Sequence, residues 1–246
     1  MFSTFNKFFN IKHTIVKYYR VDLHSHLIPG IDDGSQSMEE SIKLIKKLKA
    51  LGYKKLITTP HIMQHRFPNS SETILAGLEN VKAELKAQNI EIKLEVAAEY
   101  YLDEYFLELL NKKDILTFGE NYLLFEMSYG QKPVNLESIV HEIRVAGYKP
   151  VLAHPERYLF MHRDFSIYES LKEQGVLFQV NLNSFNGYYS KPVQKVVLKI
   201  LENGWVDFIG SDTHKAKQLE YLSKNLDSKV MSQIFEKSTI LNDTLL

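Results

Sequence analysis

Val21-Asp22-Leu23-His24-Ser25-His26 is a short, mostly apolar run that ends in two histidines one residue apart. Its composition predicts a β-strand over residues 21–24. Side chains two positions apart on a strand share a face, so both imidazoles are expected to reach one cation. A lone His-x-His pair is only moderately specific, because two satisfied or exposed histidines explain it about as well. The residues at the ends of the other strands therefore decide its meaning.

Six further strand-like runs alternate with helical patterns along the chain. Residues 37–51 repeat apolar positions at three- and four-residue intervals, with Ser37 and Glu40 spaced as a capping box and Gly52 as a stop. Residues 74–85, 136–146, 167–173 and 193–201 repeat the scheme. The alternation predicts an α/β fold of parallel βα units, and seven strands suggest a barrel. The expected strands are 21–24, 55–59, 92–97, 122–126, 150–153, 176–180 and 206–210.

Composition bounds the class of protein without naming a partner. Hydrophobic residues are 44% and charged residues 24% of 246, which is ordinary for a globular protein. Thirty basic residues balance thirty acidic ones, so no net field favours nucleic acid. The apolar runs are too short to span a bilayer. Without a linker or repeat, we expect one domain over residues 21–246 and an appendage over residues 1–20.

The chain has no cysteine, which excludes disulfides, thiolate zinc sites and cysteine nucleophiles. This is compatible with a reducing compartment, and we expect a cytoplasmic protein. The appendage interleaves phenylalanines with lysines, a pattern that favours a membrane interface. An arm packed on the barrel or a frayed tail is the preferred interpretation of the same segment.

Histidines and carboxylates follow the carboxyl ends of the other predicted strands. In a parallel barrel these ends meet on one face, where active sites collect. Glu99 and Glu126 end otherwise apolar runs, and a buried carboxylate needs a partner. Asp33 lies in the loop after the first strand, where Asp32 and Asp33 are equally compatible with a turn. The candidates exceed what one ion needs, which predicts two or three ions. They are His24, His26, Asp33, His61, Glu99, Glu126, His154, Asp212 and His214.

The motifs resemble those of the PHP (polymerase and histidinol phosphatase) superfamily over most of residues 21–214. The matching motifs are Asp22-Leu23-His24-Ser25-His26, Thr59-Pro60-His61, His154 and Asp212-Thr213-His214. More narrowly, Ile31-Asp32-Asp33-Gly34-Ser35 and Ala153-His154-Pro155-Glu156-Arg157-Tyr158 resemble the manganese-dependent tyrosine-protein phosphatases of bacterial capsule and exopolysaccharide systems, the CpsB/CapC type.

The resemblance implies a distorted seven-stranded TIM-like (β/α) barrel, the PHP fold. It also implies a trinuclear site built from all nine candidates, with Mn²⁺ as the ion. Iron or zinc would suit the same imidazole and carboxylate ligands. The partner implied is a phosphotyrosine protein, a membrane-bound bacterial tyrosine kinase. The resemblance therefore implies a protein-tyrosine phosphatase in which a metal-activated hydroxide attacks phosphorus.

Three positions are candidates for phosphate or substrate binding. Arg157 follows His154 by three residues, and its planar guanidinium matches phosphate oxygens. A surface arginine paired with Glu156 or another loop acid is the alternative. Arg66 and Phe67 form an expected substrate rim, with Phe67 placed to stack on a tyrosine ring and Arg66 to attract acidic flanking residues.

Asp22 is expected to support the metal site by accepting a hydrogen bond from a ligand imidazole. A purely structural role at the start of the strand is the alternative. At the level of function, two alternatives to the tyrosine phosphatase are open. One is a small-molecule phosphatase such as histidinol phosphatase, and the other is a non-catalytic metal-binding scaffold.

Overall fold

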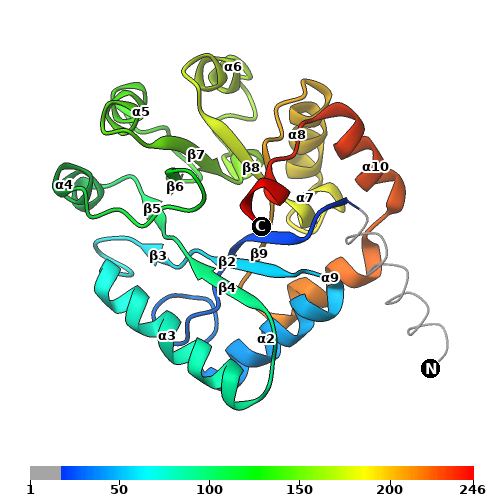
Figure 1. The fold of residues 1–246 in the computed structure, drawn as a ribbon. Helices are drawn as coiled ribbons and strands as arrows, with labels where there is room; N and C mark the ends of the chain where they lie inside the picture. The colour runs from blue at the N-terminus through cyan, green and yellow to red at the C-terminus, as the bar shows by residue number, and fades with distance from the viewer. Residues whose placement is uncertain (1–17) are drawn as a thin grey trace.

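A curled, all-parallel sheet forms the centre of the molecule, and helices surround it (Figure 1). The computed structural model describes residues 18–246. Its nine strands are ordered β3-β5-β6-β7-β8-β9-β1-β2-β4. They are β1 Val21–Ser25, β2 Lys55–Thr58, β3 His61–Ile62, β4 Lys93–Val96, β5 Glu99–Tyr101, β6 Tyr122–Glu126, β7 Lys149–Ala153, β8 Leu177–Asn181 and β9 Phe208–Thr213.

All seven expected strands are present, and the structure adds two short ones. A break at Thr59–Pro60 separates the expected β2 from β3, and a break at Ala97–Ala98 separates the expected β4 from β5. Proline has no backbone N–H to donate to a ladder, which accounts for the first break. On the amino-terminal side of the two breaks β2 pairs with β4, and on the carboxyl-terminal side β3 pairs with β5. The fold is thus the distorted TIM-like α/β arrangement that the sequence predicts.

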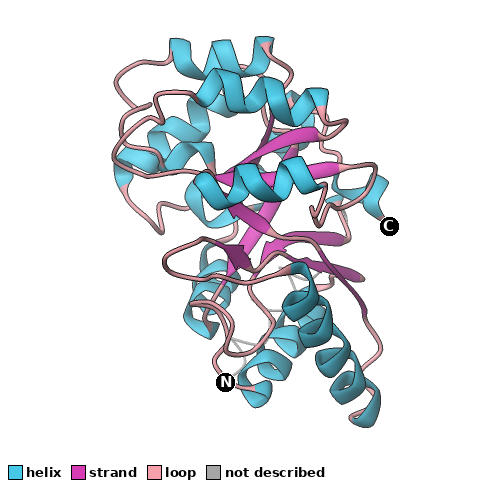
Figure 2. Cartoon of the chain, turned by 90° about the vertical axis from the view of Figure 1, so that its left-hand side faces the viewer, coloured by secondary structure: helices cyan, strands magenta, loops and turns pink. Residues whose placement is uncertain are grey.

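Helices cover the outside of the sheet (Figure 2). All five helices expected from periodicity are present as α2 Met38–Leu51, α3 Ser71–Ala87, α5 Leu136–Val145, α6 Ser166–Glu173 and α8 Lys191–Glu202. The structure adds four that periodicity did not predict: α4 Glu104–Lys112, α7 Leu182–Phe185, α9 Ala216–Asn225 and α10 Ser228–Lys237. Short 3₁₀ turns, η1 Pro155–Arg157 and η2 Asn242–Leu245, complete the described elements.

The caps of α2 explain its bounds. The Ser37 hydroxyl accepts from the backbone N–H of Glu40, as expected of an N-cap. The Glu40 carboxylate accepts from the N–H of Gln36, whereas a complete capping box would use that of Ser37. Gly52 ends the helix with φ 112°, a left-handed conformation that glycine adopts without steric cost.

Two apolar clusters hold the fold together. One lies between the sheet and the helices, and the other fills the inside of the barrel. The inner cluster includes Val21 and Leu23 of β1, and Leu245 packs with it from the C-terminal turn η2. The carbonyl of Leu245 accepts from Lys55 at the start of β2, so η2 covers the amino ends of the strands. The carboxyl ends of the strands, on the opposite side, are not covered by η2, and the candidate ligands lie there.

Residues 1–17 of the expected appendage lie outside the described residues. The remainder of that segment packs on the barrel: the Tyr19 side chain is buried, and its hydroxyl lies 2.8 Å from that of Tyr53. Arg20 pairs with Asp243 of the C-terminal turn at 3.2 Å. No helix within residues 18–246 has the length and hydropathy to cross a bilayer.

Gly210 of β9 lies where neighbouring strands leave no room for a side chain. A Cβ there would lie 2.3 Å from the Leu23 carbonyl oxygen and 2.5 Å from Nε2 of Gln179. We expect Gly210→Ala to lower the free energy of unfolding by about 3 kcal/mol, measured by urea denaturation. Gly130→Ala is the matched control, because nothing lies within 4 Å of its added Cβ. Equal stability of the two variants would contradict this close approach.

Candidate active site

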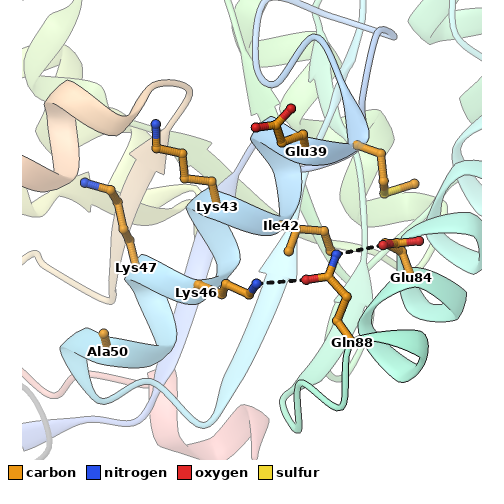
Figure 3. Close-up of a pocket in the computed structure, with 9 residues that line it drawn as sticks. Glu39, Ile42, Lys43, Lys46, Lys47, Ala50, Glu84 and Gln88 are labelled. Atoms are coloured by element: carbon orange, nitrogen blue, oxygen red, sulfur yellow. Dashed lines mark hydrogen bonds between the residues drawn. The ribbon is translucent and has the colours of Figure 1, made fainter.

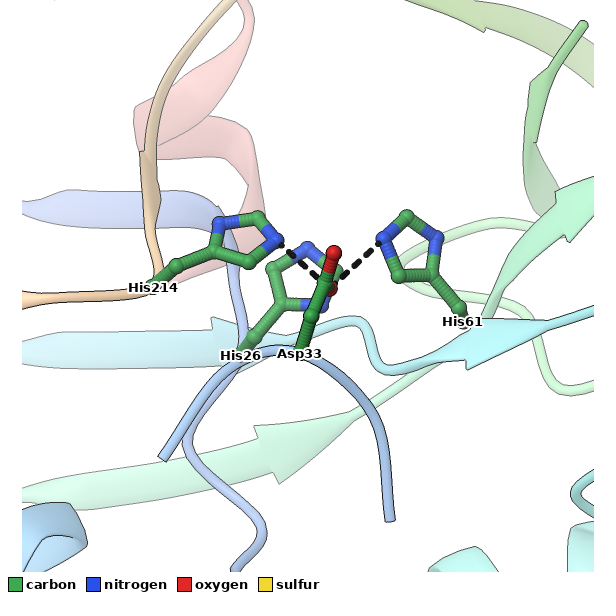
Figure 4. A group of neighbouring side chains, drawn as sticks. All are labelled: His26, Asp33, His61 and His214. Carbon is green, nitrogen blue, oxygen red and sulfur yellow. Dashed lines mark ion pairs between the residues drawn. The ribbon is translucent and has the colours of Figure 1, made fainter. Parts of the chain in front are cut away.

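The nine candidate ligands meet at the carboxyl ends of the strands. They form four overlapping groups whose possible ligand atoms lie within 4.8 Å of one another. The outermost group combines an aspartate from the loop after β1 with one histidine in β3 and with the histidines that directly follow β1 and β9 (Figure 4). In it, Asp33 Oδ1 lies 3.2 Å from Nε2 of His214 and 3.4 Å from Nε2 of His61. The groups are His26–Asp33–His61–His214, His24–Glu99–His154, His24–His26–Asp212 and His61–Glu99–Glu126.

Glu99 of β5 lies at the centre of the cluster. Its Oε2 is 3.0 Å from His24 Nε2 and 3.2 Å from His61 Nδ1, and its Oε1 is 2.9 Å from His154 Nε2. Oε2 is also 3.5 Å from His26 Nε2. The Glu99 side chain is fully buried. Glu99 belongs to two of the four groups, so it could serve as a ligand in both.

The donor set fits a group of divalent cations. His26 Nε2 and His61 Nδ1 are buried and face Glu99 without forming a hydrogen bond, which is the arrangement of ligand atoms directed at a common centre. Three buried carboxylates, Glu99, Glu126 and Asp212, lie in this cluster, and cations nearby would balance their charge. Neutral imidazoles with carboxylates suit manganese, iron or zinc.

Three of the candidates have a left-handed backbone conformation that non-glycine residues rarely adopt. The φ angles are 78° for His24, 36° for His154 and 48° for Asp212. Such residues are strained by about 1–3 kcal/mol each, and they cluster at functional sites. At His24 the strain coincides with an irregularity in the register between β1 and β9. Surrounding contacts must hold these three side chains in place.

Asp22 was predicted to accept a hydrogen bond from a ligand imidazole, and this partner was wrong. Its carboxylate accepts from the backbone N–H and the hydroxyl of Ser211 at 3.0 and 2.8 Å, and from no imidazole. Its neighbours Val21 and Leu23 point into the barrel, so alternation turns Asp22 outward. The left-handed turn at His24 breaks that alternation and brings the imidazole inside. Burial raises the pKa of Asp22 to about 8.

Other residues support the imidazoles instead. Asp32 lies 2.7 Å from Nδ1 of His26, and Gln179 Oε1 lies 2.6 Å from Nδ1 of His24. The sequence marks Asp32 only as a possible turn residue, although its place beside Asp33 is a signal for this role. No sequence signal marks Gln179. Asn181, at the end of β8, donates to Asp212 at 2.7 Å.

Arg157 lies beside the cluster in a pocket of ≈ 540 Å³. Its Nη1 donates to Asp212 Oδ2 at 2.8 Å, and its guanidinium lies 4.7 Å and 4.5 Å from the ring centroids of Tyr129 and Tyr189. The alternative partner, Glu156, is buried and accepts from Asn181 and Ser184 instead. The Arg157 side chain is 23% exposed, so it faces the pocket with donors to spare.

Arg66 and Phe67 both line this pocket. The Phe67 ring stacks on the imidazole of His61, with centroids 5.4 Å apart and planes at 11°. Arg66 lies 5.0 Å over the Phe67 ring and 3.6 Å from Asp33. Phe67 therefore supports a candidate ligand, and its role in stacking on a substrate stays a prediction.

Neighbouring carboxylates favour the protonated form of His24 and of His214. Burial opposes protonation of His24, but Glu99 and Asp212 outweigh it and raise its pKa to about 9. Burial likewise opposes protonation of His214, and Asp212 and Asp33 raise its pKa to about 10. Hydrogen bonds from His214 and His61 lower the pKa of Asp33.

Metal binding is therefore expected to release protons, since an imidazole must be neutral to coordinate. His24 and His214 carry protons at pH 7 that the ions displace, so metal affinity should rise with pH. The apparent dissociation constant should fall about tenfold per pH unit for each proton displaced, up to about pH 9. Titration calorimetry in buffers of different ionisation enthalpy measures the protons released. An affinity independent of pH would contradict the expectation.

A second cavity, of ≈ 790 Å³, lies between α2 and α3 (Figure 3). Its polar lining is three lysines of α2 with Glu39, Glu84 and Gln88, and it contains no histidine. Lys46 donates to Gln88, which donates to Glu84. Lys47 pairs with Glu220 outside this cavity. The candidate ligands all lie away from it, at the strand ends.

The chain has relatives of matching length. The family model described as "Capsular polysaccharide synthesis, CpsB/CapC" matches residues 20–241. CapC of Staphylococcus aureus is 27% identical over 226 residues, which cover 91% of this chain and 89% of that protein. The tyrosine-protein phosphatase YwqE of Bacillus subtilis is 24% identical over 230 residues, which cover 90% and 91%.

The fold also has a solved counterpart. A crystal structure from work on YwqE of Bacillus subtilis and CpsB of Streptococcus pneumoniae, described as metal-dependent tyrosine phosphatases, matches with a TM-score of 0.76. Its identity is 23%, over 89% of this chain and 96% of that one. With the family model matching nearly all of the described residues, this chain belongs to the CpsB/CapC family of capsular polysaccharide synthesis.

Proposed function

We propose that this chain is a metal-dependent protein-tyrosine phosphatase of capsule or exopolysaccharide synthesis. One observation carries the proposal: nine imidazole and carboxylate side chains meet at one end of the barrel, with Arg157 beside them in an open pocket. Relatives that match nearly the whole chain are named tyrosine-protein phosphatases. The reaction is hydrolysis of a phosphate monoester.

The four groups of candidate ligands would hold the metal ions. Divalent ions bound there would neutralise phosphoryl oxygens and lower the pKa of a water toward neutrality. We propose three ions, and Mn²⁺ as the ion in the cell, from the resemblance to the manganese-dependent type. Iron and zinc suit the same ligands, so added metal must be compared directly.

Arg157 binds the phosphate in this proposal. One of its N–H groups is committed to Asp212, which orients the guanidinium, and the others remain for phosphate oxygens. The apolar wall of the pocket, which includes Phe67, Tyr101 and Tyr129, suits the ring of a phosphotyrosine. The chain has no cysteine, so no phosphocysteine intermediate can form.

A turnover panel tests the function. Phosphotyrosine peptide, phosphoserine peptide and histidinol phosphate are compared with Mn²⁺, Fe²⁺, Zn²⁺ or a chelator. We expect kcat/KM for phosphotyrosine to exceed the others by about tenfold or more, and the chelated protein to be inactive. Preference for histidinol phosphate would indicate a small-molecule phosphatase. Metal binding without turnover would indicate the scaffold alternative.

The physiological substrate proposed is a membrane-bound bacterial tyrosine kinase, which would place the reaction in the cytoplasm. Support comes from the match to capsular polysaccharide synthesis. For residues 1–20, an arm packed on the barrel or a frayed tail is preferred to contact with the membrane. Such contact can be tested by comparing the membrane association of the full chain with that of a chain starting at residue 18.

A further inference from the structure

We propose that Gln179 and Asn181 form an amide relay that positions His24 and Asp212 for the metal centre. The inference rests on the proposed function, because it takes those two residues as metal ligands. Gln179 and Asn181 would act through His24 and Asp212, without touching the substrate.

The relay is a continuous chain of hydrogen bonds. His24 Nδ1 lies 2.6 Å from Gln179 Oε1, Gln179 Nε2 donates to Asn181 Oδ1 at 3.0 Å, and Asn181 Nδ2 donates to Asp212 Oδ2 at 2.7 Å. All four residues are at most 2% exposed. The relay runs from β1 through β8 to β9, across the position where Gly210 has no side chain.

The direction of every hydrogen bond in the relay is set by Asp212. Its carboxylate pairs with the permanently charged Arg157, so it is ionised and can only accept. Asn181 must therefore present its NH₂ to Asp212 and its oxygen to Gln179. Gln179 then presents its own NH₂ to Asn181 and its oxygen to His24. A carbonyl oxygen can only accept, so His24 donates through Nδ1 and keeps Nε2 as the ligand atom.

The relay fixes the carboxylate as well as the imidazole. Asp212 Oδ2 accepts from Arg157 at 2.8 Å, from Asn181 at 2.7 Å and from Tyr189 at 3.3 Å. Its other oxygen, Oδ1, lies 3.2 Å from His214 Nδ1 and 3.6 Å from His24 Nε2. Oδ2 of Asp212 thus accepts three hydrogen bonds, and Oδ1 faces the candidate ligands His24 and His214.

Both ends of the relay need such support. His24 and Asp212 have left-handed backbones, which persist only when surrounding structure holds them. His26 has a different support, the carboxylate of Asp32. A neutral amide on one imidazole and a carboxylate on the other make His24 and His26 ligands of unequal basicity.

Metal affinity tests the relay without any substrate. Dissociation constants and stoichiometry for Zn²⁺ and Mn²⁺ are measured by competition with a chromophoric chelator. The variants are Gln179→Ala, Gln179→Glu, Asn181→Leu and the double variant Gln179→Ala/Asn181→Leu. Asn242→Ala is the matched control, because Asn242 is a buried amide that joins β1 and β9 through Val21 and Ile209, away from the cluster.

We expect Gln179→Ala to weaken at least one ion by roughly 10–100-fold. Gln179→Glu keeps an acceptor for His24 and should recover part of the loss. Asn181→Leu should weaken metal binding as well. The double variant should lose no more metal affinity than the more strongly affected single variant, because the two residues act as a unit. Asn242→Ala should lower stability and leave the dissociation constants unchanged.

Wild-type metal affinity in a folded Gln179→Ala variant would overturn the relay. A double variant whose fold-change in dissociation constant equals the product of the two single fold-changes would overturn it too. A ¹⁵N spectrum of the zinc-loaded wild-type protein tests the same point with no variant. We expect His24 to carry its proton on Nδ1, and zinc on Nδ1 would overturn the inference. Wild-type protein that binds no metal would instead refute the proposed function, and the relay with it.

Discussion

Glu99→Gln is expected to abolish metal binding and, with it, phosphatase activity. Glu99 lies close to four imidazoles from the ends of three strands, β1, β3 and β7, so no other single side chain joins as many of the candidate ligands within the described residues. The amide keeps the shape of the side chain but removes its charge and directs an NH₂ group at nitrogen ligands. We expect metal content to fall to background and kcat/KM to fall by about 10³-fold or more.

Metal content by mass spectrometry and turnover of a phosphotyrosine peptide measure the two effects. Glu91→Gln is the matched control, because this glutamate is exposed just before β4 and outside the pocket. It should keep full metal and activity. A Glu99→Gln variant that retained all its metal would reassign Glu99 from ligand to structural partner of the histidines.

The strands were predictable because their residues carry a local signal. The run 122–126 was predicted with the bounds that β6 has, since it is apolar up to Glu126 and mostly buried. The strands β3 and β5 lie beyond the expected runs and depend on tertiary pairing, since β3 pairs with β5 and β5 with β6. The helices α9 and α10 come after the last strand, where the alternation of strand and helix no longer requires one.

The ligand positions were predictable for a similar reason. Parallel strands end on one face, so residue type and strand end were enough to gather all nine candidates. The residues that support the ligands were not predictable. Gln179 of β8 contacts His24 of β1 because of the order of the strands in the sheet, which the sequence does not show. Asp22 was misplaced because strict alternation does not allow for the left-handed turn at His24.

Arg157→Ala is expected to lower kcat/KM by about 10²–10³-fold while leaving the metal in place. Removing the guanidinium takes one donor from Asp212 Oδ2, but Asn181 and Tyr189 still hold that oxygen. The metal ligands therefore stay oriented, and the loss is in binding the phosphate. Inhibition by inorganic phosphate should weaken in parallel, since it reports the same contact without chemistry.

Arg157→Lys separates charge from shape. Lysine keeps the positive charge but lacks the planar guanidinium and its stacking on Tyr129 and Tyr189. We therefore expect kcat/KM of Arg157→Lys to be only about tenfold higher than that of Arg157→Ala. Arg163→Ala is the matched control, an exposed arginine on the loop after η1 that does not line the pocket, and should behave as wild type. Loss of metal together with activity in Arg157→Ala would mean that Arg157 acts by holding Asp212. Retained metal with weakened phosphate inhibition would place it on the substrate.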